Sequence, residues 1–344
     1  MHPKNLLLAV LATLLLVSCG SPLEKKDLKT CTKISGVPGP EDLDLIEIDK
    51  KPTLLISVHN RRNMESIGWI STLDLNMPVA DQKPIPIQTK YPENFRPHGI
   101  SFAKVNGKDT LAVISHTLTS DKPHTIEIFE RIGSNQWTHT KTLSDPLLTG
   151  PNDIFMNSKG EIFASNDRGP ENKFMQYVNM IFKNGTADIA YYDGNKFANL
   201  NQKVVLGNGI FLREENGDEI LYRSVFSEAA ISVFKIIREN GNLSLEFRKK
   251  IDLGSGPDNI MPDAEGNLWV AAHPSTLKFL KHASSNQNLA PSQVYKIDAK
   301  TNAVELIYSN EGSEIPAAST GLVSGDRIYI SQVFEDFLLT CSKP

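Results

Sequence analysis

The stretch SGPDNIMPDAEGNLWVAAHP, residues Ser255–Pro274, decides the fold because its opening phrase recurs along the chain. Asp258 and Asn259 stand before an apolar pair and are followed, after a short turn, by the strand-like run NLWVAAHP. One such acid–amide pair is an ordinary turn, where Asp and Asn are favoured. Each recurrence, however, has a small or turn-forming lead, two polar or glycine positions, and then Leu or Ile. The copies are GPEDLDL from Gly39, RPHGISF from Arg96, GPNDIFM from Gly150, GNGIFL from Gly207, GPDNIMP from Gly256 and ASTGLV from Ala318.

The six copies are evenly spaced. Their anchor residues lie 57, 54, 56, 50 and 62 residues apart, and these anchors are Glu41, His98, Asn152, Asn208, Asp258 and Thr320. Each copy precedes a run rich in β-branched and aromatic residues, such as TLAVISH (110–116) or RIYISQVF (327–334), which is typical of a strand. A unit of this length holds four short strands. The sequence therefore predicts an all-β, six-bladed β-propeller over residues 31–344, rather than the two domains that a length of 344 residues suggests.

A propeller brings the same position of every blade to one level around the central axis. Acids and amides scattered from Glu41 to Asn259 are therefore expected to converge in a central tunnel. Acids at close range raise each other's pKa, and a bound cation removes their repulsion. Because the candidate ligands are carboxylate and amide oxygens, with no cysteine among them, we expect Ca²⁺ rather than zinc or copper.

The N-terminus predicts export. The apolar run from Leu6 to Val17 is too short to span a bilayer but fits the core of a secretory signal. The following LVSCG looks like a bacterial lipobox, in which Cys19 is lipid-modified and becomes the first mature residue. We therefore predict a signal peptide at 1–18, a lipidated tether at 19–30, and a lipid-anchored, periplasmic or cell-surface protein. Gly20 lacks the Asp that often retains such proteins at the inner membrane, so an outer-membrane location is favoured.

The two remaining cysteines, Cys31 and Cys341, lie near the two ends of the mature chain. An exported location permits disulfides, and an isolated terminal pair suggests a clasp that closes the ring. The net charge of −4 carries no basic excess, so no nucleic-acid partner is expected.

The chain resembles the paraoxonase/arylesterase family of calcium-dependent lactonases. The resemblance spans Cys31 to Cys341 and rests on an ordered set of motifs: GPEDLDL, PHGIS, the SH that ends the next strand, NDI, ASND, NGI, DNI and LWVAAHP. Both cysteines match the family's clasping disulfide. The resemblance implies two calcium ions in the central tunnel. It assigns the catalytic ion to Glu41, Asn152, Asn208, Asp258 and Asn259, and the deeper structural ion to Asp42, Asp153 and the backbone carbonyl of Ile100.

The resemblance also implies a reaction, the hydrolysis of lactones with aryl esters as a related activity. Calcium would polarise the substrate carbonyl oxygen, and His98 would act as general base on the attacking water, oriented or relayed by His116. His273 would line the pocket, with a packing role as the alternative. His124 and His282 have no such support. One departure concerns the substrate: after ASND the family commonly has His, where this chain has Arg168.

Two other functions stay open. One is a sugar lactonase of the gluconolactonase type, which shares a tunnel metal. The other is a non-enzymatic propeller lipoprotein that binds a ligand and uses calcium only for stability. No Gly-x-Ser-x-Gly elbow and no zinc motif is present in the sequence, so a serine esterase or a zinc enzyme is not expected.

Overall fold

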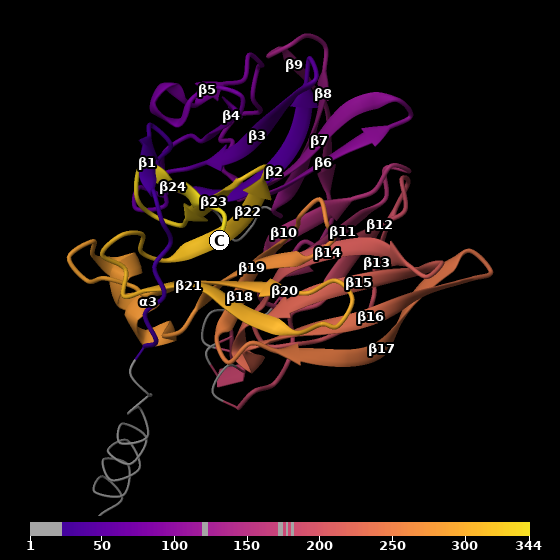
Figure 1. The fold of residues 1–344 in the computed structure, drawn as a ribbon. Helices are drawn as coiled ribbons and strands as arrows, with labels where there is room; N and C mark the ends of the chain where they lie inside the picture. Colours follow the sequence, from indigo (N-terminus) through magenta and orange to yellow (C-terminus); the bar gives the residue numbers. More distant parts are fainter. Residues whose placement is uncertain (1–22, 119–122, 171–174, 177, 180–181) are drawn as a thin grey trace, which may run out of the picture.

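The computed structural model describes residues 23–118, 123–170, 175–176, 178–179 and 182–344. Over these residues the strands form six four-stranded antiparallel sheets, arranged as the blades of a propeller (Figure 1). The prediction of an all-β, six-bladed propeller is confirmed. Each innermost strand contacts the innermost strand of the next blade, and the last contacts the first, which closes the ring.

The four strands of a blade follow one another outward from the axis. The innermost strands are β2 (Pro40–Ile48), β6 (Pro97–Val105), β10 (Pro151–Met156), β14 (Gly207–Glu215), β18 (Gly256–Pro262) and β22 (Ala318–Ser324). The second strands are β3 (Lys51–Val58), β7 (Lys108–Ser115), β11 (Ile162–Asn166), β15 (Asp218–Val225), β19 (Leu268–His273) and β23 (Arg327–Gln332). The third strands are β4 (Trp69–Asp74), β8 (Thr125–Arg131), β12 (Ile189–Tyr192), β16 (Ala230–Glu239), β20 (Ser292–Ile297) and β24 (Phe337–Ser342). The outermost strands are β5 (Ile85–Pro86), β9 (Trp137–Ser144), β13 (Phe197–Asn199), β17 (Asn242–Asp252), β21 (Val304–Asn310) and β1 (Thr32–Ser35).

Short helices occur in the segments that connect the strands. The α-helix α3 (Thr276–Ser284) follows β19 and begins at Ser275, whose side chain accepts a hydrogen bond from the backbone N–H of Lys278. Two 3-10 turns are η1 (Val79–Asp81) and η2 (Phe226–Glu228).

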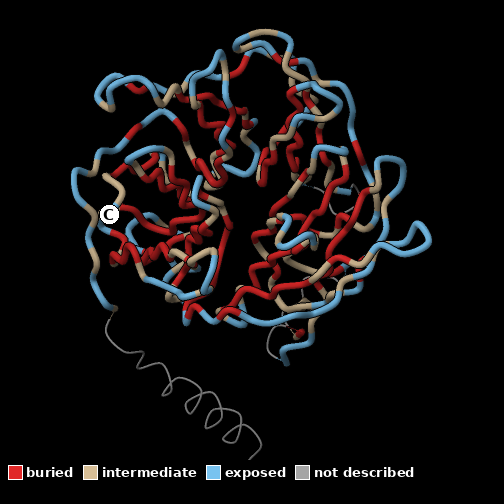
Figure 2. The backbone as a smooth tube through the Cα atoms, turned by 45° about the vertical axis from the view of Figure 1, so that its right-hand side comes forward, coloured by how far each residue is buried: buried red, intermediate tan, exposed pale blue. Residues whose placement is uncertain are grey.

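Apolar clusters fill the seams between neighbouring blades. One cluster joins Leu55 of β3 to Leu111 and Phe129 of the next blade, and another joins Tyr222 of β15 to Val270 of β19. Figure 2 shows the buried segments gathered inside the ring and the exposed loops around its circumference. Because the seams hold the blades together, the polar inner wall can be devoted to a site.

The two ends of the chain share the sixth blade. β1 pairs antiparallel with β24, Thr32 opposite Thr340, and a disulfide joins Cys31 to Cys341 across 310 residues. This confirms the predicted clasp. Lys26, within the predicted tether, exchanges backbone hydrogen bonds of 3.0 and 2.9 Å with Ser309 of β21.

The predicted signal peptide and Cys19 lie outside the described residues, so neither is placed here. Along the part of the chain that is described, no helix has the length and hydropathy needed to cross a membrane.

Every innermost strand has a β-bulge at the repeated phrase. In the first blade the register shifts between Pro40 and Leu43, and in the fifth between Pro257 and Ile260. The other four innermost strands shift at the matching place. Since a bulge leaves residues unpaired and re-aims their side chains, the polar positions of the phrase are freed from the strand ladder. The repeat in the sequence is thus a repeat of bulges.

Two glycines of the phrase allow neighbouring bulges to approach closely. A Cβ at Gly99 would lie 2.6 Å from the carbonyl oxygen of Asn152, and a Cβ at Gly209 would lie 2.4 Å from that of Asp258. No side chain fits at such distances, so glycine is required by space rather than by backbone angle. Successive polar phrases are thereby pressed together at the centre of the ring.

Candidate functional site

The bulges bring together acids and amides from distant parts of the chain. Glu41, Asp42 and Asp258 are each at most 4 % exposed, and Asn259 is 1 % exposed. The Asn259 Nδ2 donates to Glu41 Oε1 and to Asp42 Oδ1, both at 3.3 Å, across 218 and 217 residues. The same atom donates to Thr320 Oγ1 at 3.0 Å. Copies one, five and six of the phrase therefore meet, as ring symmetry predicts.

The five residues assigned to the catalytic ion share one unusual property. Each has a buried side-chain oxygen that no described residue supplies with a hydrogen bond; these are Glu41 Oε2, Asn152 Oδ1, Asn208 Oδ1, Asp258 Oδ1 and Asn259 Oδ1. An unsatisfied buried acceptor costs about 1–3 kcal/mol. Five of them on touching bulges indicate a common partner that carries positive charge and accepts oxygen ligands.

The composition of this oxygen set favours a hard cation. Three of the five residues are asparagines, so the set is not a cluster of His, Cys, Asp or Glu, and the described residues contain no such cluster of three or more arranged to hold a metal. Oxygen-only ligands with a mixture of carboxylates and neutral amides suit Ca²⁺ and give zinc or copper no soft or imidazole ligand. The residues present therefore fit calcium.

Three buried acids on the innermost strands have pKa values above the usual range for carboxylic acids. Burial raises the pKa of Glu41 to about 8; Arg61 opposes this rise, while Asp258 and Asp153 add to it. Burial likewise raises the pKa of Asp153 to about 8 and the pKa of Asp42 well above its ordinary value. A cation at these oxygens would favour the charged form instead.

The two deeper acids cross-link neighbouring blades. Asp42 accepts the backbone N–H of Leu43 at 2.8 Å and, through its other oxygen, that of Ile100 in the second blade at 2.7 Å. Asp153 of the third blade accepts the N–H of Ile154 and that of Ile210 in the fourth, both at 2.7 Å. Ile100 thus contacts Asp42 through its N–H, and the ligand role predicted for its carbonyl stays a prediction.

His98 lies between a guanidinium and a carboxylate. Arg61 Nη2 lies 3.2 Å from His98 Nδ1, and His98 Nε2 lies 3.7 Å from Glu41 Oε2. Since arginine can only donate, a neutral His98 accepts at Nδ1 and carries its proton on Nε2, facing the carboxylate. Burial, followed by the positive charge of Arg61 and the neighbouring His116, lowers the pKa of His98 well below its usual value.

His116 contacts His98 by ring stacking. The ring centroids lie 4.5 Å apart with 22° between the planes, and His116 Nε2 donates to the backbone carbonyl of Pro151 at 2.8 Å. Burial and the nearby His124 lower the pKa of His116 to about 3. His116 is therefore a neutral ring with a fixed tautomer, placed to hold the plane of His98.

His273 bonds a predicted metal ligand. Its Nε2 lies 2.8 Å from Asp258 Oδ2, which leaves Asp258 Oδ1 free for a cation. The imidazole is 3 % exposed and lies against Phe226 and Phe279, with centroids at 5.8 and 4.6 Å. Hydrogen bonding of this kind orients metal ligands, so the structure gives His273 a contact that serves both the pocket and packing alternatives.

The structure adds three residues to which the sequence assigned no role in the site. Arg61 contacts His98, and His124, set aside in the sequence, lies against His116. Arg168, noted in the sequence only as a departure from the family, contacts His124. A signal existed: Arg61 follows β3 and Arg168 follows β11, just as His116 follows β7. Because the second strand of a blade runs antiparallel to the first, its end lies beside the bulge. His124 precedes β8 and gave no comparable signal. His282 lies on α3, where it hydrogen-bonds to Arg62 and to the backbone carbonyl of Asn288 and contacts none of the predicted site residues in the described structure.

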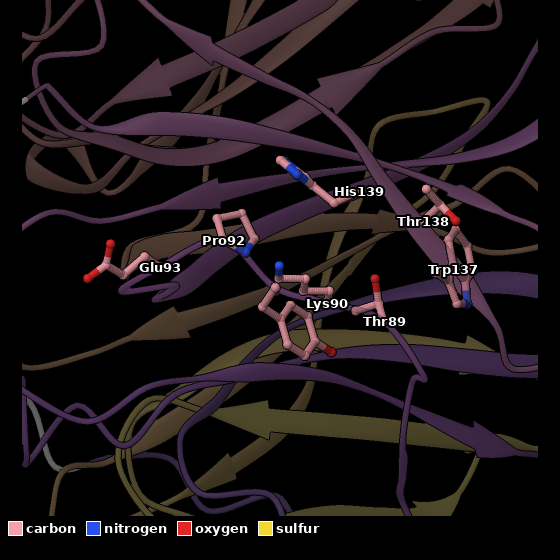
Figure 3. A pocket seen from close by; sticks show the side chains of 8 residues that line it. Thr89, Lys90, Pro92, Glu93, Trp137, Thr138 and His139 are labelled. Atoms are coloured by element: carbon pink, nitrogen blue, oxygen red, sulfur yellow. The ribbon is translucent and has the colours of Figure 1, made fainter.

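A surface depression lies away from these residues. A depression of about 520 Å³ is lined by residues 89–93, just before β6, and by Trp137–His139 of β9 (Figure 3). None of the predicted site residues lines it. The buried oxygens, rather than the size of a surface hollow, therefore identify the candidate site.

Comparison with known proteins places the chain among the arylesterases. The family model described as "Arylesterase" matches residues 50–342. Human serum paraoxonase/arylesterase 2 is 25% identical over 329 residues, covering 91% of this chain and 88% of that protein. Rat serum paraoxonase/arylesterase 1 is 25% identical over 322 residues, covering 90% and 87%. The mechanosensory abnormality protein 6 of Caenorhabditis elegans is 24% identical over 254 residues, covering 71% of this chain and 65% of that protein.

Solved structures share the architecture. A gluconolactonase from Xanthomonas campestris superposes with a TM-score of 0.52 at 14% identity, covering 95% of this chain and 99% of that one. A PQQ-bound aldose sugar dehydrogenase from Streptomyces coelicolor reaches 0.53 at 12% identity, covering 92% and 100%. These proteins differ in activity, so the likeness concerns the fold alone.

The raised pKa values predict how stability depends on pH. In chelator, the folded protein keeps protons on Glu41 and Asp153 up to about pH 8, whereas the unfolded chain releases them near pH 4. The stabilisation is therefore complete below pH 4 and is lost as pH rises to 8, at up to about 1.4 kcal/mol per pH unit for each group. We expect the melting temperature in EDTA to fall from pH 5 to pH 8, and to fall less for Glu41→Gln. A flat or rising curve would contradict the assignment.

Proposed function

We propose, from the premise that this chain belongs to the arylesterase family, that it is a calcium-dependent hydrolase of lactones and aryl esters. Family membership supports a hydrolase acting on small molecules. The observation that carries the calcium assignment is the set of five buried oxygens without hydrogen-bond donors, on the five residues that the family pattern names.

The residues that would hold the catalytic ion are Glu41, Asn152, Asn208, Asp258 and Asn259. Two carboxylates balance the charge of a dication, and three amide oxygens complete its shell without adding charge. When bound, the ion would supply positive charge that stabilises the oxyanion developing on a substrate carbonyl. A second ion beside Asp42 and Asp153 would add to hydrogen bonds that already tie blades one to two and three to four.

We assign His98 as the base that takes a proton from the attacking water. Its lowered pKa keeps the ring neutral at pH 7, which a base requires. The only lone pair of that neutral ring is at Nδ1, where Arg61 donates. Proton abstraction therefore needs the Arg61 hydrogen bond to be exchanged for one from water. His116, stacked on His98 and bonded to Pro151, would keep the imidazole plane fixed during that exchange.

His273 would hold Asp258 in position through its 2.8 Å hydrogen bond. This assignment makes His273 a positioning residue at the wall of the pocket, since the bond faces the carboxylate rather than a reacting atom.

A substrate panel tests the proposal. Purified protein should hydrolyse one or more of γ- and δ-lactones, phenyl acetate and gluconolactone, lose turnover in EDTA, and regain it with Ca²⁺. Turnover confined to gluconolactone would favour the sugar-lactonase alternative. A melting temperature that responds to Ca²⁺, with no turnover on any substrate, would favour the ligand-binding propeller.

The variant His98→Gln tests the base. Gln keeps a polar side chain but cannot accept a proton, so kcat should fall by about 10²- to 10⁴-fold with little change in melting temperature. His139→Gln, on the outer strand β9, is the matched control and should retain full turnover. Unchanged kcat in His98→Gln would remove His98 from the base role.

We further propose that the protein is exported and lipid-anchored at Cys19, with the outer membrane favoured. The lipobox LVSCG at residues 16–20 supports this location. Cys19→Ala expressed in a bacterial host should move the protein from the membrane fraction to the soluble fraction and abolish labelling by a radioactive fatty acid. Labelling that persists in the variant would contradict the anchor.

A further inference from the structure

A column of aromatic rings leads away from the catalytic histidine. His98 stacks on His116, and His116 lies against His124 with ring centroids 4.8 Å apart. At the end of the column, Arg168 Nη2 lies 3.3 Å from His124 Nε2. The Nη1 of Arg168 is occupied by the Asp167 carboxylate, at 3.0 and 3.1 Å. The column thus begins beside Glu41 and ends at a guanidinium that faces an imidazole.

The hydrogen bonds around His124 do not match its chemistry. Its Nδ1 faces the backbone N–H of Thr117 at 3.2 Å, and its Nε2 faces Arg168. Both neighbours are obligate donors, but a neutral imidazole has one lone pair and an imidazolium has none. Burial and Arg168 lower the pKa of His124 to about 4, so the ring is neutral. With Nδ1 accepting from Thr117, an N–H of His124 and an N–H of Arg168 point at each other.

His98 shows what a matched arrangement looks like. It also receives an arginine N–H, but its second nitrogen faces a carboxylate. At His124 the acceptor is missing from the pair, and two converging N–H groups are the donors that a carboxylate takes.

Gly150, directly before β10, leaves room for the side chain of Arg168. A Cβ at Gly150 would lie 2.6 Å from Arg168 Cγ and 2.4 Å from Asp167 Oδ1, so the glycine lets these side chains lie over the strand. Asn152, one of the assigned calcium ligands, is two residues further along. The donor pair therefore lies beside the reaction centre.

We propose that Arg168 and His124 form a subsite for a carboxylate on the acyl tail of the substrate. The inference rests on the proposed function, since it names the class of ester or lactone that this site prefers: one whose acyl chain ends in a carboxylate. The substrate carboxylate accepts one hydrogen bond from Arg168 Nη2 and one from His124 Nε2, which resolves the donor–donor contact.

The test compares monophenyl adipate with methyl phenyl adipate, in which a methyl ester replaces the charged carboxylate of the acyl tail. The release of phenol from each ester is followed with the full-length protein and Ca²⁺. Arg168→Gln should lower kcat/KM for the carboxylate ester about ten- to hundredfold more than for the methyl ester, the usual range for a hydrogen bond to a charged group. His124→Phe, which keeps an aromatic ring in the column, should lower the same ratio about fivefold. Arg248→Gln removes a surface arginine paired with Glu246 and should leave the ratio unchanged.

A binding measurement separates this inference from the proposed function. Monomethyl adipate is titrated calorimetrically into wild type, Arg168→Gln and Arg248→Gln, and the subsite predicts weaker binding only for Arg168→Gln. If neither ester is hydrolysed but this pattern holds, the subsite stands and the hydrolase proposal fails. If phenol is released and Arg168→Gln affects both esters equally, or if binding does not depend on Arg168, the subsite is refuted.

Discussion

The close approach of bulged strands at the axis is the constraint on which the rest of the molecule depends. Carboxylates of Asp42 and Asp153 reach across to backbone N–H groups of the following blade. Those N–H groups belong to Ile100 and Ile210, each directly after a glycine whose missing side chain admits the next blade. Neighbouring blades thus contact each other at the bulges, where the strand pairing within each blade is interrupted.

The six copies of the phrase alternate between two kinds along the chain. The first, third and fifth phrases carry two polar residues, whereas the second, fourth and sixth carry one polar residue followed by glycine. In the first and third blades the second polar residue, Asp42 or Asp153, accepts a backbone N–H of the next blade. In the second and fourth blades Gly99 and Gly209 leave room for the strand that follows. Asp42 and Asp153 are acids whose pKa values are raised by burial, so their charged forms are disfavoured in the absence of a cation. The proposed cation would favour the charged forms. Asn259, one of its assigned ligands, also hydrogen-bonds to residues of the first and sixth blades, so the proposed site shares residues with the scaffold.

The fold was predictable because its signal is long-range and periodic. Six phrases at even spacing fix the number of blades, and convergence of Glu41 with Asn259 follows from ring symmetry without any knowledge of side-chain geometry. The contacts of Arg61 and Arg168 were not predictable in the same way. Each depends on which direction a side chain takes after a strand ends, and a sequence pattern does not encode that direction. The bulges also escaped prediction, since a pair of polar residues reads equally well as a turn. The signal peptide and Cys19 rest on the sequence alone.

The two ends of the histidine column differ in the hydrogen-bonding groups that face the ring nitrogens. At His98, Arg61 donates to Nδ1 and the Glu41 carboxylate lies 3.7 Å from Nε2, so the neutral ring carries its proton on Nε2, on the side of the carboxylate. At His124, two donors flank the ring and no proton position satisfies both. In the proposed mechanism, His98 exchanges its Arg61 hydrogen bond for one from water and regains it afterwards. His124, which faces two donors, would instead be stabilised by a bound ligand oxygen that accepts a hydrogen bond. His98 stacks on His116, and His124 lies tilted against the same ring, whose tautomer is set by its hydrogen bond to Pro151. The proposed base and the proposed carboxylate subsite would therefore lie at opposite ends of one column of rings.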